Sequence, residues 1–212
     1  YNLCPVFSFK LHLKNTFKKY TDLLKMKKVL LLLASGFEIL EASAFIDVMG
    51  WNLLEGDKTT ILMTCGLRKE INSSFNQRFK VDCIIEEVDV DSYHALAIPG
   101  GFEEYKYYKD AYSKLFLELI REFNKQNKII ASVCVGALPI GKSGVLVGKN
   151  GTTYNNEMRR NELKAFGVNV VNKPIAIYDE IITSNGPFTA IEVAFLLLGK
   201  LTSIDNAKKV GK

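Results

Sequence analysis

Short apolar runs alternate with helical patterns along most of this chain, and this alternation strongly constrains its fold. Lys28–Ala34 (KVLLLLA) is a continuous apolar run, typical of a strand buried on both faces of a parallel sheet. Ser35-Gly36 breaks the run, and Glu38–Met49 then carries apolar residues at helical spacing, with Gly50 as the predicted stop. Strands that alternate with helices of roughly 10–15 residues indicate a doubly wound, mostly parallel α/β sheet with helices on both faces.

The same two patterns predict the other elements of this sheet. Further strands are expected at Thr59–Thr64, Phe79–Ile85 (paired with Glu70–Phe75), Ala95–Ile98, Lys128–Val133, Val168–Val171, Ile175–Tyr178 and Ile181–Ser184, with a short extended segment at Gly151–Tyr154. Further helices are expected at Tyr112–Asn124, Arg159–Phe166 and Phe188–Leu198. In such sheets, ligands bind beyond the carboxyl ends of the strands. The turns Ser35–Glu41, Pro99–Gly101 and Cys134–Gly136 should therefore meet there.

The positive charge of the chain is concentrated in residues 1–25. This segment holds five lysines and one aspartate, so it carries +4 of the formal net charge of +5. It could be an organellar targeting peptide or a surface-binding amphipathic arm. We expect instead a non-essential extension, because Met26 resembles a natural start just before the first strand. Residues 26–202 are then expected to form one domain. Residues 203–212 start another helical pattern and are expected to be a C-terminal tail with a truncated helix.

Charge and hydropathy also limit the expected partners. The chain beyond residue 25 keeps a net charge of only +1, so it shows no basic footprint for nucleic acid. No apolar run reaches the roughly 18–20 residues needed to cross a bilayer. We therefore expect neither nucleic acid nor a membrane as a partner.

The four cysteines are Cys4, Cys65, Cys83 and Cys134, and they form no C-x-x-C pair and no Cys/His metal spacing. A domain of this size does not need a disulfide framework, so we expect a reducing cytoplasm. Cys134 follows the apolar run Ile129–Val133 at a small-residue turn before a helical pattern. A helix terminus there would favour the thiolate and a reactive cysteine. The alternative is a buried structural cysteine.

Two other turns carry groups that could assist a reactive cysteine. The glycines of Pro99-Gly100-Gly101 can turn N–H groups toward a developing oxyanion, although the same tripeptide also forms generic turns. Glu38 and Glu41 open the first predicted helix. Burial beside a thiolate would raise the pKa of such a glutamate and let it move a proton, whereas ordinary helix-start acidity is the alternative.

Histidine is nearly absent, which weighs against a papain-like or amidotransferase-like nucleophile. His12 lies in the basic extension. His94 lies at the amino end of the strand that ends at Pro99, at the opposite end of the sheet from the expected site. Neither is placed to act as the base of a Cys–His pair.

Five segments together resemble the ThiJ/PfpI superfamily, with the branch of the parkinsonism-associated protein deglycase and its bacterial relatives as the nearest match. They are GFEILEAS, ALAIPGGFE, ASVCVGALPIG, TTY and TSNGPFTAIEVA, within a resemblance that runs from about Lys27 to Leu201. The resemblance implies a flavodoxin-like fold of the class I glutamine-amidotransferase type and a homodimer. It implies no metal and no organic cofactor.

The resemblance also implies roles for individual residues. Cys134 would be the nucleophile on a strained elbow, and Glu41 the protonated glutamate beside it. The backbone N–H groups of Gly101 and Val135 would form the oxyanion pocket. The wall of the site would be made by Gly100, Gly136, Tyr154, Gly186 and Pro187.

One position departs from the pattern of the superfamily. Many members carry histidine after a Thr-Thr pair, whereas here Thr152-Thr153 is followed by Tyr154. A phenol at neutral pH is a hydrogen-bond partner and not a ready base. Protease activity is therefore not expected, and glyoxalase or deglycase chemistry would have to use Glu41 and Cys134 without the histidine.

The implied function is that of a cysteine-dependent stress-response protein. It would act on small reactive carbonyls, such as methylglyoxal or its early adducts, as a glyoxalase III-like or protein/nucleotide deglycase-like hydrolase or lyase. The alternative is a non-enzymatic redox sensor or chaperone in which Cys134 is oxidised to a sulfinate. A third possibility is a non-catalytic dimer that retains an ancestral pocket. The cluster after the Gly-Gly turn is expected either as a rim of the site or as a solvated loop, and comprises Glu103, Glu104, Tyr105, Tyr107 and Tyr108.

Overall fold

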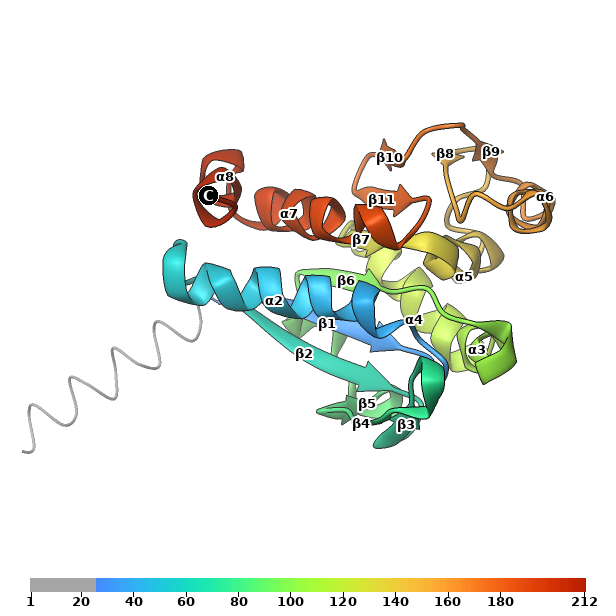
Figure 1. Ribbon diagram of the computed structural model, residues 1–212, viewed down its shortest axis with the longest axis horizontal. Coiled ribbons are helices and arrows are strands. Elements are labelled where there is room, and N and C mark those ends of the chain that lie inside the picture. Colours follow the sequence, from blue (N-terminus) through green and yellow to red (C-terminus); the bar gives the residue numbers. More distant parts are fainter. Residues whose placement is uncertain (1–25) are drawn as a thin grey trace, which may run out of the picture.

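Seven strands form one central sheet in the order β10-β11-β7-β6-β1-β2-β5 (Figure 1). The computed structural model describes residues 26–212. All neighbouring strands of this sheet are parallel except β10, which runs antiparallel to β11. The strands are β1 (Lys27–Leu33), β2 (Thr60–Gly66), β5 (Cys83–Ile84), β6 (Ala95–Ile98), β7 (Ile129–Ser132), β10 (Ile175–Tyr178) and β11 (Ile181–Ser184). The predicted doubly wound, mostly parallel sheet is confirmed.

Two small pairs of strands lie outside the main sheet. β3 (Glu70–Asn72) pairs with β4 (Arg78–Lys80) in an antiparallel hairpin, and β8 (Asn150–Gly151) pairs with β9 (Asn169–Val170) in parallel. The hairpin lies beside the β2–β5 edge of the sheet (Figure 1).

Helices cover both faces of the sheet. On one face α2 (Ile39–Glu55), α7 (Ala190–Leu201) and α8 (Ile204–Val210) pack against one another. The other group comprises α3 (Tyr107–Ala111), α4 (Lys114–Lys125), α5 (Ala137–Lys142) and α6 (Glu157–Ala165). No helix within residues 26–212 is long and apolar enough to cross a membrane. The predictions about the basic extension concern residues outside the described part.

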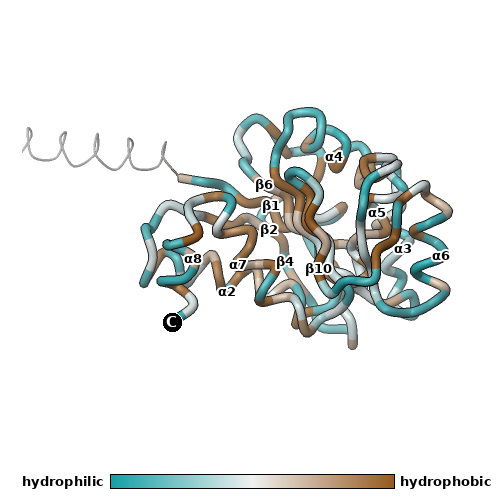
Figure 2. Tube along the Cα trace, turned by 90° about the horizontal axis from the view of Figure 1, so that it is seen from above, coloured by the Kyte–Doolittle hydropathy of each residue, from teal (hydrophilic) through white to brown (hydrophobic). Residues whose placement is uncertain are grey.

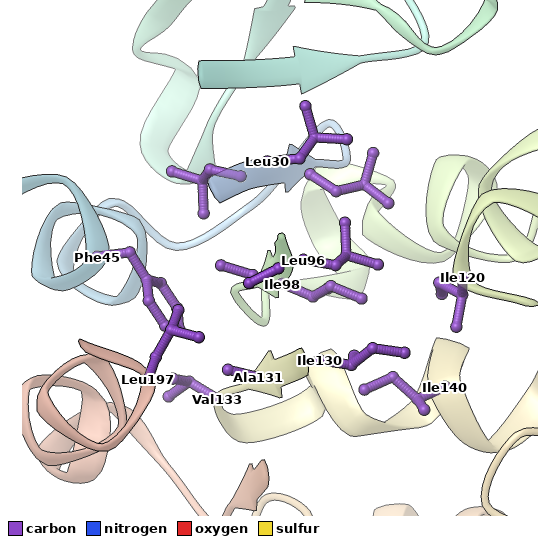
Figure 3. Close-up of a cluster of buried hydrophobic side chains, with 14 of the residues drawn as sticks. Leu30, Phe45, Leu96, Ile98, Ile120, Ile130, Ala131, Val133, Ile140 and Leu197 are labelled. Carbon is purple, nitrogen blue, oxygen red and sulfur yellow. The ribbon is translucent and has the colours of Figure 1, made fainter. Parts of the chain in front are cut away.

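The core is formed where helices from the two faces meet the central strands. Leu96 of β6 is fully buried. Phe45 of α2 and Leu197 of α7 lie on one side of the sheet, and Ile120 of α4 and Ile140 of α5 lie on the other (Figure 3). The central strands also contain the most hydrophobic part of the trace (Figure 2). Cover on both faces explains why the first strand is a continuous apolar run and not an alternating one.

The prediction that the first helix ends at Gly50 is wrong, because α2 continues to Glu55. A single glycine inside a helix costs only about 1 kcal/mol relative to alanine. The turn beyond it is held by Asn52, whose fully buried side chain hydrogen-bonds to three neighbouring segments. Tertiary contacts therefore outweigh the local preference of the glycine.

The predicted strand Phe79–Ile85 is divided into two short ones. β4 pairs with β3, as expected, whereas β5 joins β2 in the main sheet. Asp82 lies between them and accepts hydrogen bonds from the backbone N–H and the hydroxyl of Thr64, at 2.8 and 2.7 Å. This side chain fixes the chain where it leaves the hairpin and enters the sheet.

We expect Asn52→Ala to lower the free energy of unfolding by about 2–3 kcal/mol, because several buried partners lose hydrogen bonds at once. Asn52 Nδ2 donates to Thr60 Oγ1 at 2.9 Å, and its Oδ1 accepts from Asn206 Nδ2 of α8 at 2.7 Å. Urea unfolding measures the change. Leu54→Ala is the control, since that side chain is 70% exposed and its loss should cost no more than about 0.5 kcal/mol. Equal effects of the two variants would show that the Asn52 network does not hold α8.

Candidate active site

The three predicted turns meet at the carboxyl ends of β1, β6 and β7. The backbone N–H of Glu38 donates to the carbonyl of Gly100 at 2.9 Å. The N–H of Gly100 donates in return to Glu41 Oε2 at 2.6 Å. The first turn of α2 is thereby joined to the turn after β6, and Cys134 lies against both.

Cys134 lies on a strained elbow between β7 and α5. Its φ angle is +57°, a left-handed conformation that costs a non-glycine residue on the order of 1–3 kcal/mol. Val133 N donates to the carbonyl of Ile98 at 3.1 Å before the elbow, and Gly136 N donates to the carbonyl of Val133 at 2.8 Å after it. Thr153 Oγ1 donates to the Cys134 carbonyl at 3.1 Å. These bonds hold the backbone in its strained form.

Two of the predicted wall glycines are required by the closeness of these segments. A Cβ atom on Gly136 would lie 2.5 Å from the carbonyl oxygen of Ile98. A Cβ on Gly100 would lie 3.0 Å from each of three site atoms, namely Cys134 Cβ, Glu41 Oε2 and the amide nitrogen of Val135. Glycine at position 100 therefore lets the carboxyl group and the sulfur-bearing residue approach each other.

Glu41 is completely buried. The pKa of its carboxyl is raised from 4.5 to about 8. Burial is the largest cause, and the nearby Glu38 carboxylate acts in the same direction. The hydrogen bond from the Gly100 N–H opposes the shift. Its Oε1 is buried and forms no hydrogen bond within the described part of the chain. Because Oε2 accepts the Gly100 N–H, Oε1 is the oxygen available to carry the proton of the neutral carboxyl. Its carboxyl group also lies beside the Cys134 thiol.

The expectation of a lowered thiol pKa is wrong in direction. Burial raises the pKa of the Cys134 thiol, and an ionised Glu41 raises it further, whereas the N–H of Val135 lowers it. Only 6% of Cys134 is exposed, and the cost of placing a charge there exceeds the gain from the helix terminus. In the resting site at neutral pH, thiol and carboxyl both keep their protons.

The two residues whose N–H groups are expected in the oxyanion pocket, Gly101 and Val135, both line the cavity beside Cys134. The Val135 N–H lies against the Cys134 sulfur. Gly101 forms a β-bridge with Phe37, but the two bonds of that bridge come from the N–H groups of Glu38 and Phe102. The Gly101 N–H takes part in neither bond.

A cavity of about 340 Å³ opens beside Cys134. It contains the expected residues Gly101, Val135, Tyr154 and Pro187 in its lining. Tyr154 is 44% exposed. The structure places Gly186 beside the ring of Tyr154, since a Cβ there would lie 4.0 Å from Tyr154 Cδ2. All the predicted site residues are thus brought together.

Sequence reasoning missed the basic member of this cavity, Arg159 of α6. Its guanidinium lies 4.5 Å from the ring centroid of Tyr108, and its NH2 donates to Glu103 Oε2 at 2.6 Å. A second bond, of 3.0 Å, joins its NH1 to Glu162. Only the charge pattern of a short amphipathic helix marked this residue, and surface helices commonly carry such arginines. The cavity also includes Asn156 and Met158, which were not predicted.

The cluster after the Gly-Gly turn is divided between different environments. Glu103, Glu104 and Tyr108 line the Cys134 cavity, as the rim prediction requires. Tyr107 is fully buried and donates its hydroxyl hydrogen to the Pro99 carbonyl at 2.7 Å. Tyr105 belongs to another cleft, of about 680 Å³, which does not contain Cys134.

The fold and this site define an α/β protein with a cysteine on a strand-to-helix elbow and a buried glutamate beside it. The model of the DJ-1/PfpI family matches residues 27–200. The chain belongs to the DJ-1/PfpI family.

The relatives have low sequence identity but long alignments. Protein dj-1beta of Drosophila melanogaster is 26% identical over 88% of this chain and 95% of its own length. Protein DJ-1 homolog A of Arabidopsis thaliana is 26% identical over 87% of this chain, which spans 45% of that protein. The chain spans about half the length of the curated relatives that match it first. Deglycase PfpI of Pyrococcus furiosus is 24% identical over 76% of this chain and 90% of its own.

The crystal structure of Drosophila melanogaster DJ-1beta superimposes with a TM-score of 0.76. It covers 88% of this chain and 96% of that chain at 24% identity. A match at this level establishes the fold, and the predicted flavodoxin-like α/β architecture is confirmed.

The raised pKa of Glu41 predicts a particular dependence of stability on pH. The folded state keeps a proton on Glu41 that the unfolded chain releases near pH 4.5. The contribution of this group to the free energy of unfolding is therefore fully present below that pH and is lost as the pH rises to about 8. The free energy of unfolding should fall by up to about 1.4 kcal/mol per pH unit in this window. Glu41→Gln, which stays neutral, should lack this part of the decline. Urea unfolding of both proteins across the window measures the difference, and parallel pH profiles would contradict a buried protonated Glu41.

Proposed function

We propose that this protein is a cysteine-dependent enzyme that acts on small reactive carbonyls, such as methylglyoxal or its early adducts. Membership of the DJ-1/PfpI family and the deglycase names of its archaeal relatives support a stress-response function of this kind. The observation that carries the proposal is the buried Glu41 carboxyl beside Cys134. One of its oxygens accepts from Gly100, and the other has no hydrogen-bond partner among the described residues 26–212.

Each group in the site has one role in this proposal. The Cys134 sulfur attacks the aldehyde carbon, so that a C–S bond forms and the carbonyl π electrons move to oxygen. The N–H groups of Gly101 and Val135 stabilise the resulting oxyanion. In the form of the site that holds one shared proton, the Glu41 carboxylate accepts the thiol proton and then donates it to the substrate oxygen.

For methylglyoxal, the hemithioacetal would lose its C–H proton to Glu41 and regain a proton at the neighbouring carbon. The product is a thioester, which water hydrolyses to a 2-hydroxy acid with release of the Cys134 thiol. The overall reaction adds one water molecule to the substrate and needs no external oxidant. A deglycase reaction would begin with the same attack on an early carbonyl adduct.

The reacting form of the site is the one in which thiol and carboxyl share one proton. Because the pKa of Glu41 is raised to about 8, this form becomes more populated as the pH rises toward that value. Turnover should increase over the same interval. Burial raises the pKa of both groups, and the carboxyl and the thiol can therefore exchange a proton.

A redox sensor is the second candidate function. Two peroxide molecules would convert the Cys134 thiol to a sulfinic acid with release of two water molecules. The specific observation in its favour is the buried Oε1 of Glu41, which has no hydrogen-bond partner among residues 26–212 and belongs to a carboxyl beside the Cys134 thiol. In the neutral carboxyl this oxygen can donate a hydrogen bond to a sulfinate oxygen. The Val135 N–H can bind the other oxygen.

The proposal includes a homodimer and a cytoplasmic setting. Leu40 and Ile191 are exposed apolar side chains on the adjacent helices α2 and α7, and the exposed Phe188 lies in the short turn just before α7. Such a surface suits a second copy of the chain. A reducing compartment would keep Cys134 as the free thiol that the chemistry needs.

Methylglyoxal consumption by wild type, Cys134→Ala and Glu41→Gln tests the enzyme. Cys134→Ala should abolish turnover. Glu41→Gln keeps a hydrogen-bond donor but cannot exchange the proton, so turnover should fall by about 10²-fold or more. Wild-type protein without turnover, but with a sulfinate at Cys134 after peroxide treatment, would favour the sensor. Full turnover in Glu41→Gln would remove the acid–base role.

Tyr154 is expected to contribute only packing or one neutral hydrogen bond. Tyr154→Phe should therefore reduce kcat/KM by a factor that corresponds to about 0.5–1.5 kcal/mol. Steady-state kinetics on methylglyoxal measure this factor beside that of Glu41→Gln. A loss as large as that in Glu41→Gln would mean that the tyrosine, and not the glutamate, moves the proton.

A further inference from the structure

Two cysteines that take no part in the Cys134 site lie directly opposite each other at the edge of the sheet. Cys65 of β2 and Cys83 of β5 are registered partners in a parallel strand pair. Both are free thiols. Strands β6 and β1 separate them from β7, which leads into Cys134, and β5 is the terminal strand on this side (Figure 1).

Registered positions on adjacent strands suit a cross-link. Neighbouring strands lie about 4.8 Å apart, and partners in register direct their side chains to the same face of the sheet. Disulfides join Cα atoms that are about 4.4–6.8 Å apart. Burial raises the pKa of the Cys65 thiol, and the Cys83 thiol lies close enough to raise it further. The two sulfurs can therefore combine without movement of either strand to a new register.

The two thiols differ in access to solvent. Cys65 is completely buried, whereas Cys83 is only partly buried and orients its thiol toward the Thr64 carbonyl at 3.7 Å. A small oxidant reaches Cys83 first. The buried Cys65 is then the nearest nucleophile, in the position of a resolving thiol.

We propose that Cys65 and Cys83 form a peroxide-sensitive dithiol that closes to a disulfide. In the first step a hydroperoxide transfers oxygen to Cys83, so that an S–O bond forms, the O–O bond breaks and one water molecule or alcohol leaves with the thiol proton. In the second step the Cys65 sulfur attacks the Cys83 sulfenic acid, the S–S bond forms, and water leaves with the second proton. Two thiols lose two electrons in total, and the peroxide gains them.

The cross-link would close residues 65–83 into a loop that contains the β3–β4 hairpin. Two backbone hydrogen bonds connect this hairpin region to the loop before α2: Gly36 N donates to the Asn72 carbonyl at 2.7 Å, and Ser74 N donates to the Phe37 carbonyl at 2.8 Å. Glu41 lies on the first turn of α2. Oxidation of the pair therefore restrains a segment adjacent to the Cys134 site without use of Cys134 itself.

Peptide mapping of the full chain after hydrogen peroxide treatment tests this pair. Trypsin cuts after Lys58, Arg68, Lys80 and Lys106, so the two cysteines fall on separate peptides, Thr59–Arg68 and Val81–Lys106. After alkylation of free thiols without reductant, these peptides should be recovered joined, with a mass lower by two hydrogens than their sum. Dithiothreitol should separate them. Cys134→Ala should show the same cross-link, because that residue takes no part.

Single variants test the order of events. Cys83→Ala should leave Cys65 reduced at a peroxide dose that oxidises the wild-type pair. Cys65→Ala should leave a sulfenic acid on Cys83 that dimedone traps. Thermal unfolding checks that both variants fold, and the wild-type map needs neither of them. Unjoined peptides at a dose that adds oxygen to Cys134, or Cys83 joined instead to Cys4, Cys134 or a second chain, would overturn the proposal.

Discussion

The hydrogen bond from the Gly100 N–H to Glu41 Oε2 is the contact on which the site depends. It joins the turn after β6 to the first turn of α2 and directs a carboxyl group into the space beside the Cys134 sulfur. A Cβ atom at position 100 would lie 3.0 Å from both Glu41 Oε2 and Cys134 Cβ, so a side chain there would crowd this space. The bond also satisfies one carboxyl oxygen by a backbone donor, and so leaves the other oxygen as the place for a proton.

The electrostatics of the site follow from burial more than from the helix terminus. Glu41 and Cys134 lie in a region where water cannot solvate a charge, and the pKa of each is raised. A solvent-exposed elbow would instead favour a thiolate. The buried pair couples the ionisation of the nucleophile to that of its acid, which suits proton transfer in catalysis and also the stabilisation of an oxidised sulfur.

The chain has a second arrangement of thiols, at the β2–β5 edge of the sheet. Cys134 is held singly on a strained elbow with a glutamate partner. Cys65 and Cys83 are instead registered partners on two adjacent strands. The two arrangements predict different oxidation products, a sulfinate in one case and a disulfide in the other, from the same oxidant.

The sequence alone determined the α/β class, the central strands and the meeting of three turns, because buried strands and amphipathic helices leave periodic patterns in the order of residues. It could not place the end of α2, because the contacts of Asn52 with Asp57, Thr60 and Asn206 outweigh Gly50. It also missed Arg159 and the registration of Cys65 with Cys83. Tertiary structure decided these points, because burial and cross-strand register depend on segments that are distant in sequence. The raised pKa of the Cys134 thiol has the same origin, since it follows from burial.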